Sequence, residues 1–143
     1  MELISPIHGK IIYEDKDIVS FKNPIPGFGN INKYILTDLY EDSPFKLLQA
    51  IDDVNIGFIL ISPFDVIDNY EIEISDSLQK RLNIQKSTDV CLYSLITLSS
   101  NVNNITANLK APLVINIKSM EGEQFITECD EYKIKHPIKK GWY

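Results

Sequence analysis

Turn-forming residues interrupt this sequence roughly every 10 positions, so the apolar segments between them are short. The longest, Val90–Leu98, has apolar residues on both sides, and Ile56–Ile61 is almost wholly apolar. Short runs bounded by proline, glycine, asparagine and aspartate are typical of strands. The pattern predicts about eight or more short strands in a mainly β, single-domain fold, an antiparallel small β-barrel or a sandwich-like barrel.

Two segments have the features of short helices. Residues 45–50 follow Asp42-Ser43-Pro44, which offers a capping residue and a proline suited to a first turn. Residues 76–82 begin at Asp76, and Gln79 stands three positions later, as in a capping box. We therefore expect one or two short helices beside the strands.

Strands are also predicted after residue 117. Glu121-Gly122 is typical of a hairpin turn, which would place strands at residues 123–128 and 132–134. His136-Pro137 would then end the last strand, because proline lacks an amide hydrogen. We expect one β-rich domain over residues 1–135 and a basic tail over residues 136–143. Trp142 is a candidate anchor in this tail, and a frayed tail is the competing interpretation.

The charge of the chain argues against direct nucleic-acid binding. Of its 143 residues, 20 are acidic and 14 are basic, which gives a net charge of -6, and Arg81 is the only arginine. Arginine supplies the bidentate contacts that hold phosphates.

The start of the chain lacks the pattern of a signal peptide, and no run approaches the roughly 20 apolar residues of a membrane span. We expect a cytoplasmic protein without a membrane partner.

Neither the cysteines nor the histidines form a pattern for catalysis or metal binding. Cys91 and Cys129 are far apart and lack the CxxC or histidine spacing of a zinc site. Cys91 lies within an apolar run, where a thiol is usually inert. His8 and His136 lie beside glycine or proline. We expect no cofactor, no metal and no enzymatic activity.

Five segments, in order along the chain, form a set of motifs that covers nearly its whole length. The segments are Pro24-Ile-Pro-Gly-Phe28, Pro44-Phe-Lys-Leu-Leu-Gln-Ala-Ile-Asp-Asp53, Gly57-Phe-Ile-Leu-Ile-Ser-Pro-Phe64, Thr106-Ala-Asn-Leu-Lys-Ala-Pro-Leu-Val-Ile-Asn116, and Gly122-Glu-Gln124 with Tyr132–Ile138. They resemble motifs of the FliW family of bacterial flagellar assembly factors. Ala50 and Ala107 are mild departures, where serine and valine are usual in that family.

The resemblance implies a protein-binding regulator. FliW-like proteins bind CsrA, a small dimeric mRNA-binding translational repressor, and they also bind flagellin. When flagellin occupies the FliW-like protein, CsrA is free to repress flagellin translation, and secretion of flagellin reverses this. The acidic composition fits a partner that must be positive to hold RNA. We expect a monomer that binds CsrA and flagellin.

The residues expected to contact a partner are mostly acidic. Residues 70–74 alternate, which predicts a strand with its glutamates on the exposed face. For the acidic candidates, the competing interpretation is a solvated surface without a partner. For Phe28, the competing interpretation is a position in the core. The candidates for partner binding are Asp52, Asp53, Tyr70, Glu71, Glu73 and Phe28.

A second set of motif residues is expected to shape the backbone. Prolines, glycines and asparagines favour turns and satisfy main-chain groups there. These structural candidates are Pro26, Gly27, Asn108, Pro112 and Asn116. The alternative function is a small-molecule-binding β-barrel, with a cavity between Tyr34, Phe58 and Tyr93.

Overall fold

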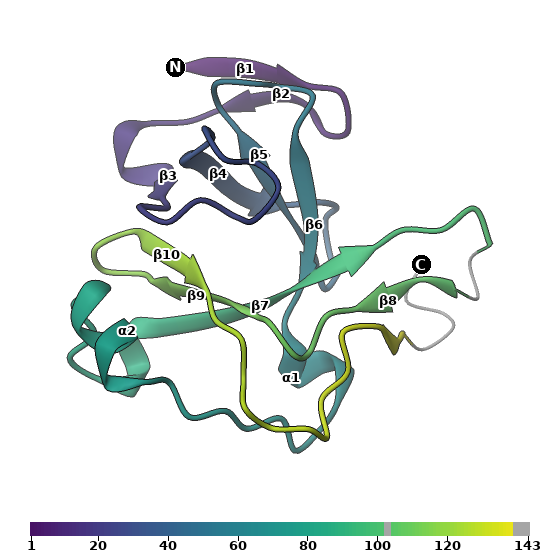
Figure 1. Cartoon of the computed structure of the whole chain (residues 1–143). Helices are drawn as coiled ribbons and strands as arrows, with labels where there is room; N and C mark the ends of the chain where they lie inside the picture. The colour runs from purple at the N-terminus through teal and green to yellow at the C-terminus, as the bar shows by residue number, and fades with distance from the viewer. Residues whose placement is uncertain (102–103, 139–143) are drawn as a thin grey trace.

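Strands make up most of the regular structure, as the computed structural model of the chain shows for residues 1–101 and 104–138 (Figure 1). A few short helical segments connect them. The elements are β1 (Glu2–Ser5), β2 (Gly9–Ile12), η1 (Asp15–Asp17), β3 (Ile18–Ser20), β4 (Lys33–Asp38), β5 (Phe45–Ala50), β6 (Gly57–Ile61), α1 (Pro63–Val66), α2 (Asp76–Arg81), η2 (Ser87–Asp89), β7 (Val90–Thr97), β8 (Thr106–Ala107), β9 (Leu113–Asn116), β10 (Glu121–Gln124) and β11 (His136–Pro137).

Seven of these strands close into a barrel, in the order β7-β6-β5-β4-β3-β10-β9 and back to β7. The predicted mainly β barrel with short helices is confirmed. The barrel is mixed, because β3 and β10 pair in parallel while the other pairs are antiparallel. The hairpin β1–β2 forms a separate sheet that lies across one end of the barrel (Figure 1).

Strand β7 closes the barrel by using both of its edges. One edge pairs with β6, where Leu95 lies opposite Leu60. The other edge pairs first with β9, where Leu92 lies opposite Val114, and then with β8, where Ile96 lies opposite Ala107. The segment 106–116 therefore runs along β7 as two strands joined by a bulge.

Asn108 and Pro112 shape that bulge. The Asn108 Oδ1 atom accepts hydrogen bonds from the amides of Lys110 and Ala111, at 3.1 and 3.0 Å. Pro112 stands just before β9, and its carbonyl accepts a hydrogen bond from the Phe125 amide at 2.9 Å. A proline at this position removes no hydrogen bond from the ladder.

Residues 45–50 form β5, so the helix predicted there is wrong. Both faces of β5 are buried: Leu48 and Ala50 face the barrel interior, and Phe45 and Leu47 face the core that includes the β1–β2 hairpin. A strand covered on both sides does not alternate, so its sequence period does not distinguish it from a buried helix.

Gln49 of β5 ties the hairpin to the barrel. The side chain is 1% exposed, and its Oε1 atom accepts a hydrogen bond from the Ser5 hydroxyl at 2.7 Å. Its Nε2 atom donates to the carbonyls of Val54 and Ile56, at 3.0 and 3.1 Å. The buried amide thus satisfies groups from β1 and from the β5–β6 turn.

The elements near the end of the chain differ from the predictions. Residues 117–120 form the turn, and Glu121-Gly122 begins β10. Residues 132–134 form no strand; instead β11, at His136–Pro137, pairs with β8, and Ile138 is buried. The prediction that His136-Pro137 ends the last strand is therefore wrong, because these two residues themselves form β11. Residues 139–143, including Trp142, lie outside the described part of the chain.

The predicted second helix is present as α2, but its cap differs from the prediction. The Ser75 hydroxyl accepts a hydrogen bond from the Leu78 amide at 3.3 Å, so Ser75 is the cap and Asp76 is the first helical residue. Leu78 and Leu82 pack against Val114 of β9. Another short helix, α1, begins at Pro63.

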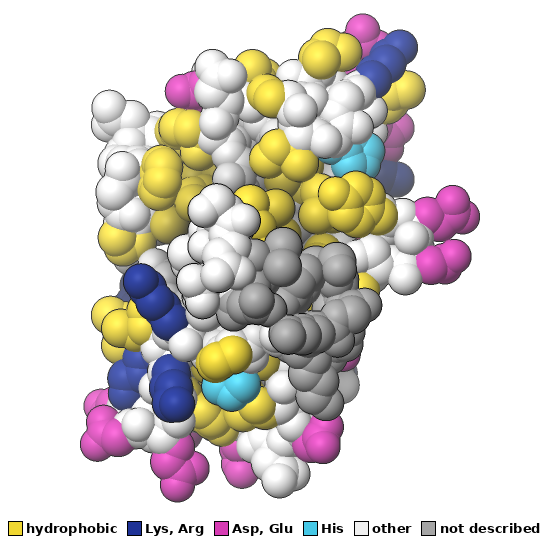
Figure 2. Space-filling view, turned by 90° about the vertical axis from the view of Figure 1, so that its right-hand side faces the viewer, with side chains coloured by type: hydrophobic (Ala, Val, Ile, Leu, Met, Phe, Trp, Pro, Cys, Tyr) yellow, Lys and Arg dark blue, Asp and Glu magenta, His cyan; other side chains and the backbone are white. Residues whose placement is uncertain are grey.

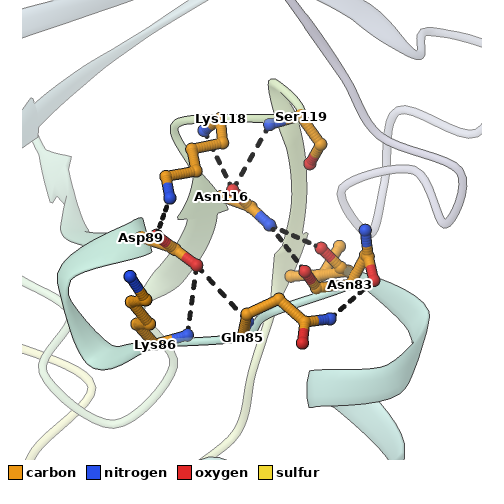
Figure 3. A network of polar contacts seen from close by, with 8 residues as sticks. Asn83, Gln85, Lys86, Asp89, Asn116, Lys118 and Ser119 are labelled. Carbon is orange, nitrogen blue, oxygen red and sulfur yellow. Dashed lines mark hydrogen bonds and ion pairs between the residues drawn. The ribbon is translucent and has the colours of Figure 1, made fainter.

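Asn116 joins the end of β9 to α2 (Figure 3). Its side chain is 2% exposed, and Nδ2 donates to the carbonyls of Leu82 and Asn83 at 2.8 and 3.2 Å. Its Oδ1 atom accepts from the amides of Lys118 and Ser119, at 2.9 and 3.3 Å. One buried amide therefore satisfies four main-chain groups in two turns.

Asp89 lies beside Asn116 and fixes the start of β7 (Figure 3). Its carboxylate accepts hydrogen bonds from the amides of Gln85 and Lys86. The Lys118 ammonium, 3.1 Å from Oδ1, lowers the pKa of the Asp89 carboxyl. The ionised carboxylate therefore holds the turn before β7.

Replacing Asn116 should destabilise the protein strongly. Asn116→Ala leaves two carbonyls and two amides without their partners, and we expect the free energy of unfolding to fall by about 2–3 kcal/mol. Urea denaturation measures this change. Asn55→Ala is the matched control, because Asn55 is exposed and should change stability by less than about 0.5 kcal/mol. Equal stabilities for the two variants would contradict the assigned role.

Candidate protein-binding surface

The predicted acidic residues lie in two separate places. Asp52 and Asp53 are in the β5–β6 turn, beside the β1–β2 hairpin, whereas Glu71 and Glu73 lie between α1 and α2 (Figure 1). These segments are at opposite ends of the molecule in this view. Phe28 lies in the loop before β4. The structure brings Tyr70, Glu71 and Glu73 together, but not with the other candidates.

Residues 70–74 alternate in burial as predicted, but they form no strand. Ile72 and Ile74 are half-buried, and Glu71 and Glu73 are exposed. In the described part of the chain, no strand pairs with this segment. Instead, the Tyr132 hydroxyl accepts a hydrogen bond from the Glu71 amide at 2.7 Å and donates to its carbonyl at 2.9 Å.

Tyr70 holds this segment against the barrel. Its side chain is 4% exposed, and its hydroxyl donates to the Leu109 carbonyl at 2.8 Å. Its ring packs against Tyr132 and Phe64, with centroids 4.6 and 5.8 Å away. Burial, with a smaller effect of Tyr132, raises the pKa of the Tyr70 hydroxyl, so it remains a donor. Glu71 and Glu73 are the exposed residues of segment 70–74.

A groove of about 530 Å³ lies between residues 71–76 and residues 125–129. We call it the acidic groove. Its lining includes the side chains of Ile72, Ile74 and Ile126. Among the described residues that line it, none is basic, and four are acidic: Glu71, Glu73, Asp76 and Glu128. The groove therefore favours a positively charged ligand.

Arg81 does not neutralise the acidic groove, because it is already paired. Its guanidinium donates two hydrogen bonds to Glu123, at 3.1 and 2.6 Å. Asn23 also donates to Glu123, at 2.8 Å. Arg81 first, and Asn23 with it, lower the pKa of the Glu123 carboxyl. The pair joins α2 to β10.

A smaller apolar groove lies at another part of the surface. It encloses about 210 Å³ and is lined by Leu39, Tyr40, Leu98, Ile105 and neighbouring apolar residues. Tyr40 and Leu98 are 64% and 62% exposed. Hydrophobic side chains gather over much of the upper part of the face shown in Figure 2. The sequence analysis did not predict this groove. Tyr40, a large aromatic residue within a polar turn, was the available signal.

Phe28 packs against the interior cluster of the barrel, whereas Pro26 and Gly27 in the turn before it are exposed. The Phe28 amide donates to the Ile25 carbonyl at 3.0 Å, and Gly27 has a φ of 91°. Pro26 and Gly27 thus occupy the positions that a type II turn favours. The Phe28 ring is half-buried and packs edge-on against Phe58, with centroids 4.9 Å apart.

The rings named for a ligand cavity pack closely instead. Tyr34 is fully buried, and its ring centroid lies 6.0 Å from that of Phe58 and 5.4 Å from that of Phe21. Tyr93 is half-buried and packs against the same interior cluster. These contacts occupy the space that the alternative, a small-molecule-binding barrel, would need.

The described residues contain no group of three or more histidines, cysteines, aspartates or glutamates that could hold a metal ion. Histidine side chains appear as separate patches in Figure 2. Cys91 and Cys129 are half-buried and form no disulfide. In the part of the chain that the structure describes, no helix is long and apolar enough to cross a membrane.

Comparison with known proteins decides the family. Residues 2–138 match the family model described as FliW protein. A flagellar assembly factor FliW from Clostridium botulinum (strain Alaska E43 / Type E3) is 46% identical over 136 residues, which cover 95% of this chain and 96% of that protein. The chain belongs to the FliW family. A FliW from Clostridium tetani (strain Massachusetts / E88) is 41% identical over 138 residues, covering 96% of this chain and 95% of that one.

The fold agrees with the assignment to the FliW family. A crystal structure of the flagellar assembly factor FliW superposes with a TM-score of 0.88 and 35% identity, and covers 99% of each chain. The predicted family is therefore confirmed. FliW proteins are non-catalytic flagellar assembly factors, which agrees with the absence of a catalytic pattern in the sequence.

The Tyr132 hydroxyl should determine the order of the segment beside the acidic groove. Tyr132→Phe keeps the ring contact with Tyr70 but removes both hydrogen bonds to Glu71. We expect amide hydrogen exchange in residues 70–74 to become roughly 5- to 10-fold faster. This corresponds to a fall of about 1–1.5 kcal/mol in the free energy of local opening. Tyr40→Phe is the control, and an unchanged exchange rate in Tyr132→Phe would contradict this role.

Proposed function

We propose that this FliW family chain is a cytoplasmic regulator that binds the translational repressor CsrA and is itself sequestered by flagellin. Flagellin would displace CsrA, and the released CsrA would repress flagellin translation until flagellin is secreted. Flagellin supply would thus match flagellin export. The proposal rests on the family membership over nearly the whole chain.

The acidic groove is the surface that best supports CsrA binding. A protein that holds RNA must present positive charge, and this groove presents four carboxylates with no basic residue among its described lining. Glu71 and Glu73 are exposed on a segment that Tyr70 and Tyr132 hold in place. A fixed acidic surface increases the rate of encounter with a basic partner and disfavours acidic ones.

The apolar groove is the better candidate for flagellin. The family picture gives flagellin an amphipathic helical terminal region, and such helices bind in hydrophobic grooves. Tyr40 and Leu98 are exposed at the edge of this groove, whereas Phe28 of the loop 24–28 packs against Phe58. Flagellin and CsrA would then contact different surfaces, and displacement would require coupling between them.

Co-purification tests the function as a whole. The tagged protein is mixed with purified CsrA, with purified flagellin, and with both together. We expect each partner to co-purify alone and flagellin to reduce the amount of bound CsrA. If neither partner binds, the proposed function is wrong; if both bind without competition, the sequestration by flagellin is wrong.

Charge reversal tests the acidic groove as the CsrA surface. Glu71→Lys with Glu73→Lys should weaken CsrA binding roughly 10-fold, because the new charges repel a basic partner. The difference should shrink as salt is raised, because exposed charges are screened. Isothermal titration calorimetry at two salt concentrations measures both effects.

Asp52→Lys with Asp53→Lys is the matched control for that experiment. It makes the same change of net charge at the opposite end of the molecule. We expect its effect on CsrA affinity to be less than about 2-fold. Equal losses in the two double variants would show a general charge effect and remove the assignment to the groove.

A further inference from the structure

We propose that the acidic groove binds an extended, basic segment of a partner protein by strand addition. The partner's main chain would lie between residues 71–74 and residues 125–128 and form hydrogen bonds with both. The inference rests on the proposed function only for the identity of the natural partner. The mode of binding follows from the unpaired main-chain groups, the charge and the shape of the groove.

One wall of the groove has the pattern of a strand that lacks its neighbour. Residues 70–74 alternate between buried and exposed, as an extended chain does. At Glu71 the Tyr132 hydroxyl bonds both the amide and the carbonyl, and so replaces the neighbouring strand. Residues two apart direct their main-chain groups to the same edge. Glu73 shares that edge, and its amide and carbonyl bond no described residue.

The other wall also presents an unpaired edge. The amides of Phe125 and Thr127 donate to the carbonyls of Pro112 and Lys110, at 2.9 and 2.8 Å. Ile126 lies between Phe125 and Thr127, so its amide and carbonyl point to the opposite edge of this segment. Its amide and carbonyl bond no described residue, and Ile126 lines the groove. The two free edges lie on opposite sides of one groove.

Side chains in the groove indicate the chemistry of the ligand. Four carboxylates and no basic group, among the described lining residues, favour alternate lysines or arginines. Ile126 is 70% exposed and offers an apolar contact for the residues between them. Thr127 is 4% exposed and lines the groove, and its hydroxyl has no hydrogen-bond partner among the described residues. A bound strand could supply that partner.

Three short peptides separate strand addition from simple charge attraction. Each has about six residues, the length of a typical strand, and blocked ends. The first alternates lysine and valine, the second alternates lysine and proline, and the third alternates glutamate and valine. The first two carry the same charge, but proline removes half of the amide donors. Calorimetry measures binding to the full chain.

We expect the lysine–valine peptide to bind, the lysine–proline peptide to bind at least roughly 10-fold more weakly, and the glutamate–valine peptide not to bind. Hydrogen exchange should show new protection at the amides of Glu73 and Ile126 in the first complex. Equal binding of the two lysine peptides would overturn strand addition. Protection confined to other residues would overturn the position of the site.

Variants of the groove test the charge contribution. Glu73→Gln with Glu128→Gln should weaken the lysine–valine peptide roughly 5-fold, because two carboxylates are neutralised. Glu41→Gln is the control, because Glu41 is exposed in the β4–β5 turn and does not line the groove. Equal affinities of the two proteins would overturn the assigned charge contacts.

The outcome is separable from that of the proposed function. Co-purification of CsrA or flagellin tests the function, whichever surface they use. The peptide measurements test the mode of binding without either partner. If CsrA co-purifies but the lysine–valine peptide gives no protection at Glu73 and Ile126, the strand-addition proposal is wrong while the function stands. If the lysine–valine peptide protects Glu73 and Ile126 but neither CsrA nor flagellin co-purifies, strand addition is supported and the proposed partners are wrong.

Discussion

The rest of the structure depends on the pairing of β7 along both of its edges. A sheet with a free edge exposes main-chain groups to other chains, and closure into a barrel removes that edge. Here β7 pairs with β6 on one side and with β9 and β8 on the other. Segment 106–116 can follow β7 because Asn108 satisfies the amides of the bulge and Asn116 secures the end of β9. The asparagines of segment 106–116 therefore serve to satisfy main-chain groups.

Closure of the barrel also explains the acidic groove. Because β3 pairs with β10 and β7 pairs with β9, the barrel closes without the segment between α1 and α2. Residues 70–74 of this segment alternate between buried and exposed, as in a strand, but pair with no strand that the structure describes. Side chains hold it instead: Tyr70 bonds the Leu109 carbonyl, and Tyr132 bonds Glu71. The segment keeps an extended form with free main-chain groups at Glu73. These free main-chain groups are the basis of the proposed strand addition.

The residues allowed the fold class and the family to be predicted. Short segments between turns indicated a β-barrel, and five motifs indicated the FliW family. The helix at residues 45–50 was wrong because β5 is buried on both faces, which hides the period of a strand. The strand at residues 70–74 was half right: its side chains alternate, but a strand needs a partner that its own sequence does not specify.

The sequence by itself determined the local chemistry: the turn at Pro26-Gly27, the bulge at Asn108 and the exposed alternation of Glu71 and Glu73. Only the tertiary structure decided which of these features meet. It placed Glu71 and Glu73 beside residues 125–129, and left Asp52 and Asp53 at the other end. Contacts between distant segments depend on how the barrel closes, because closure fixes their relative positions, and no local pattern records that geometry.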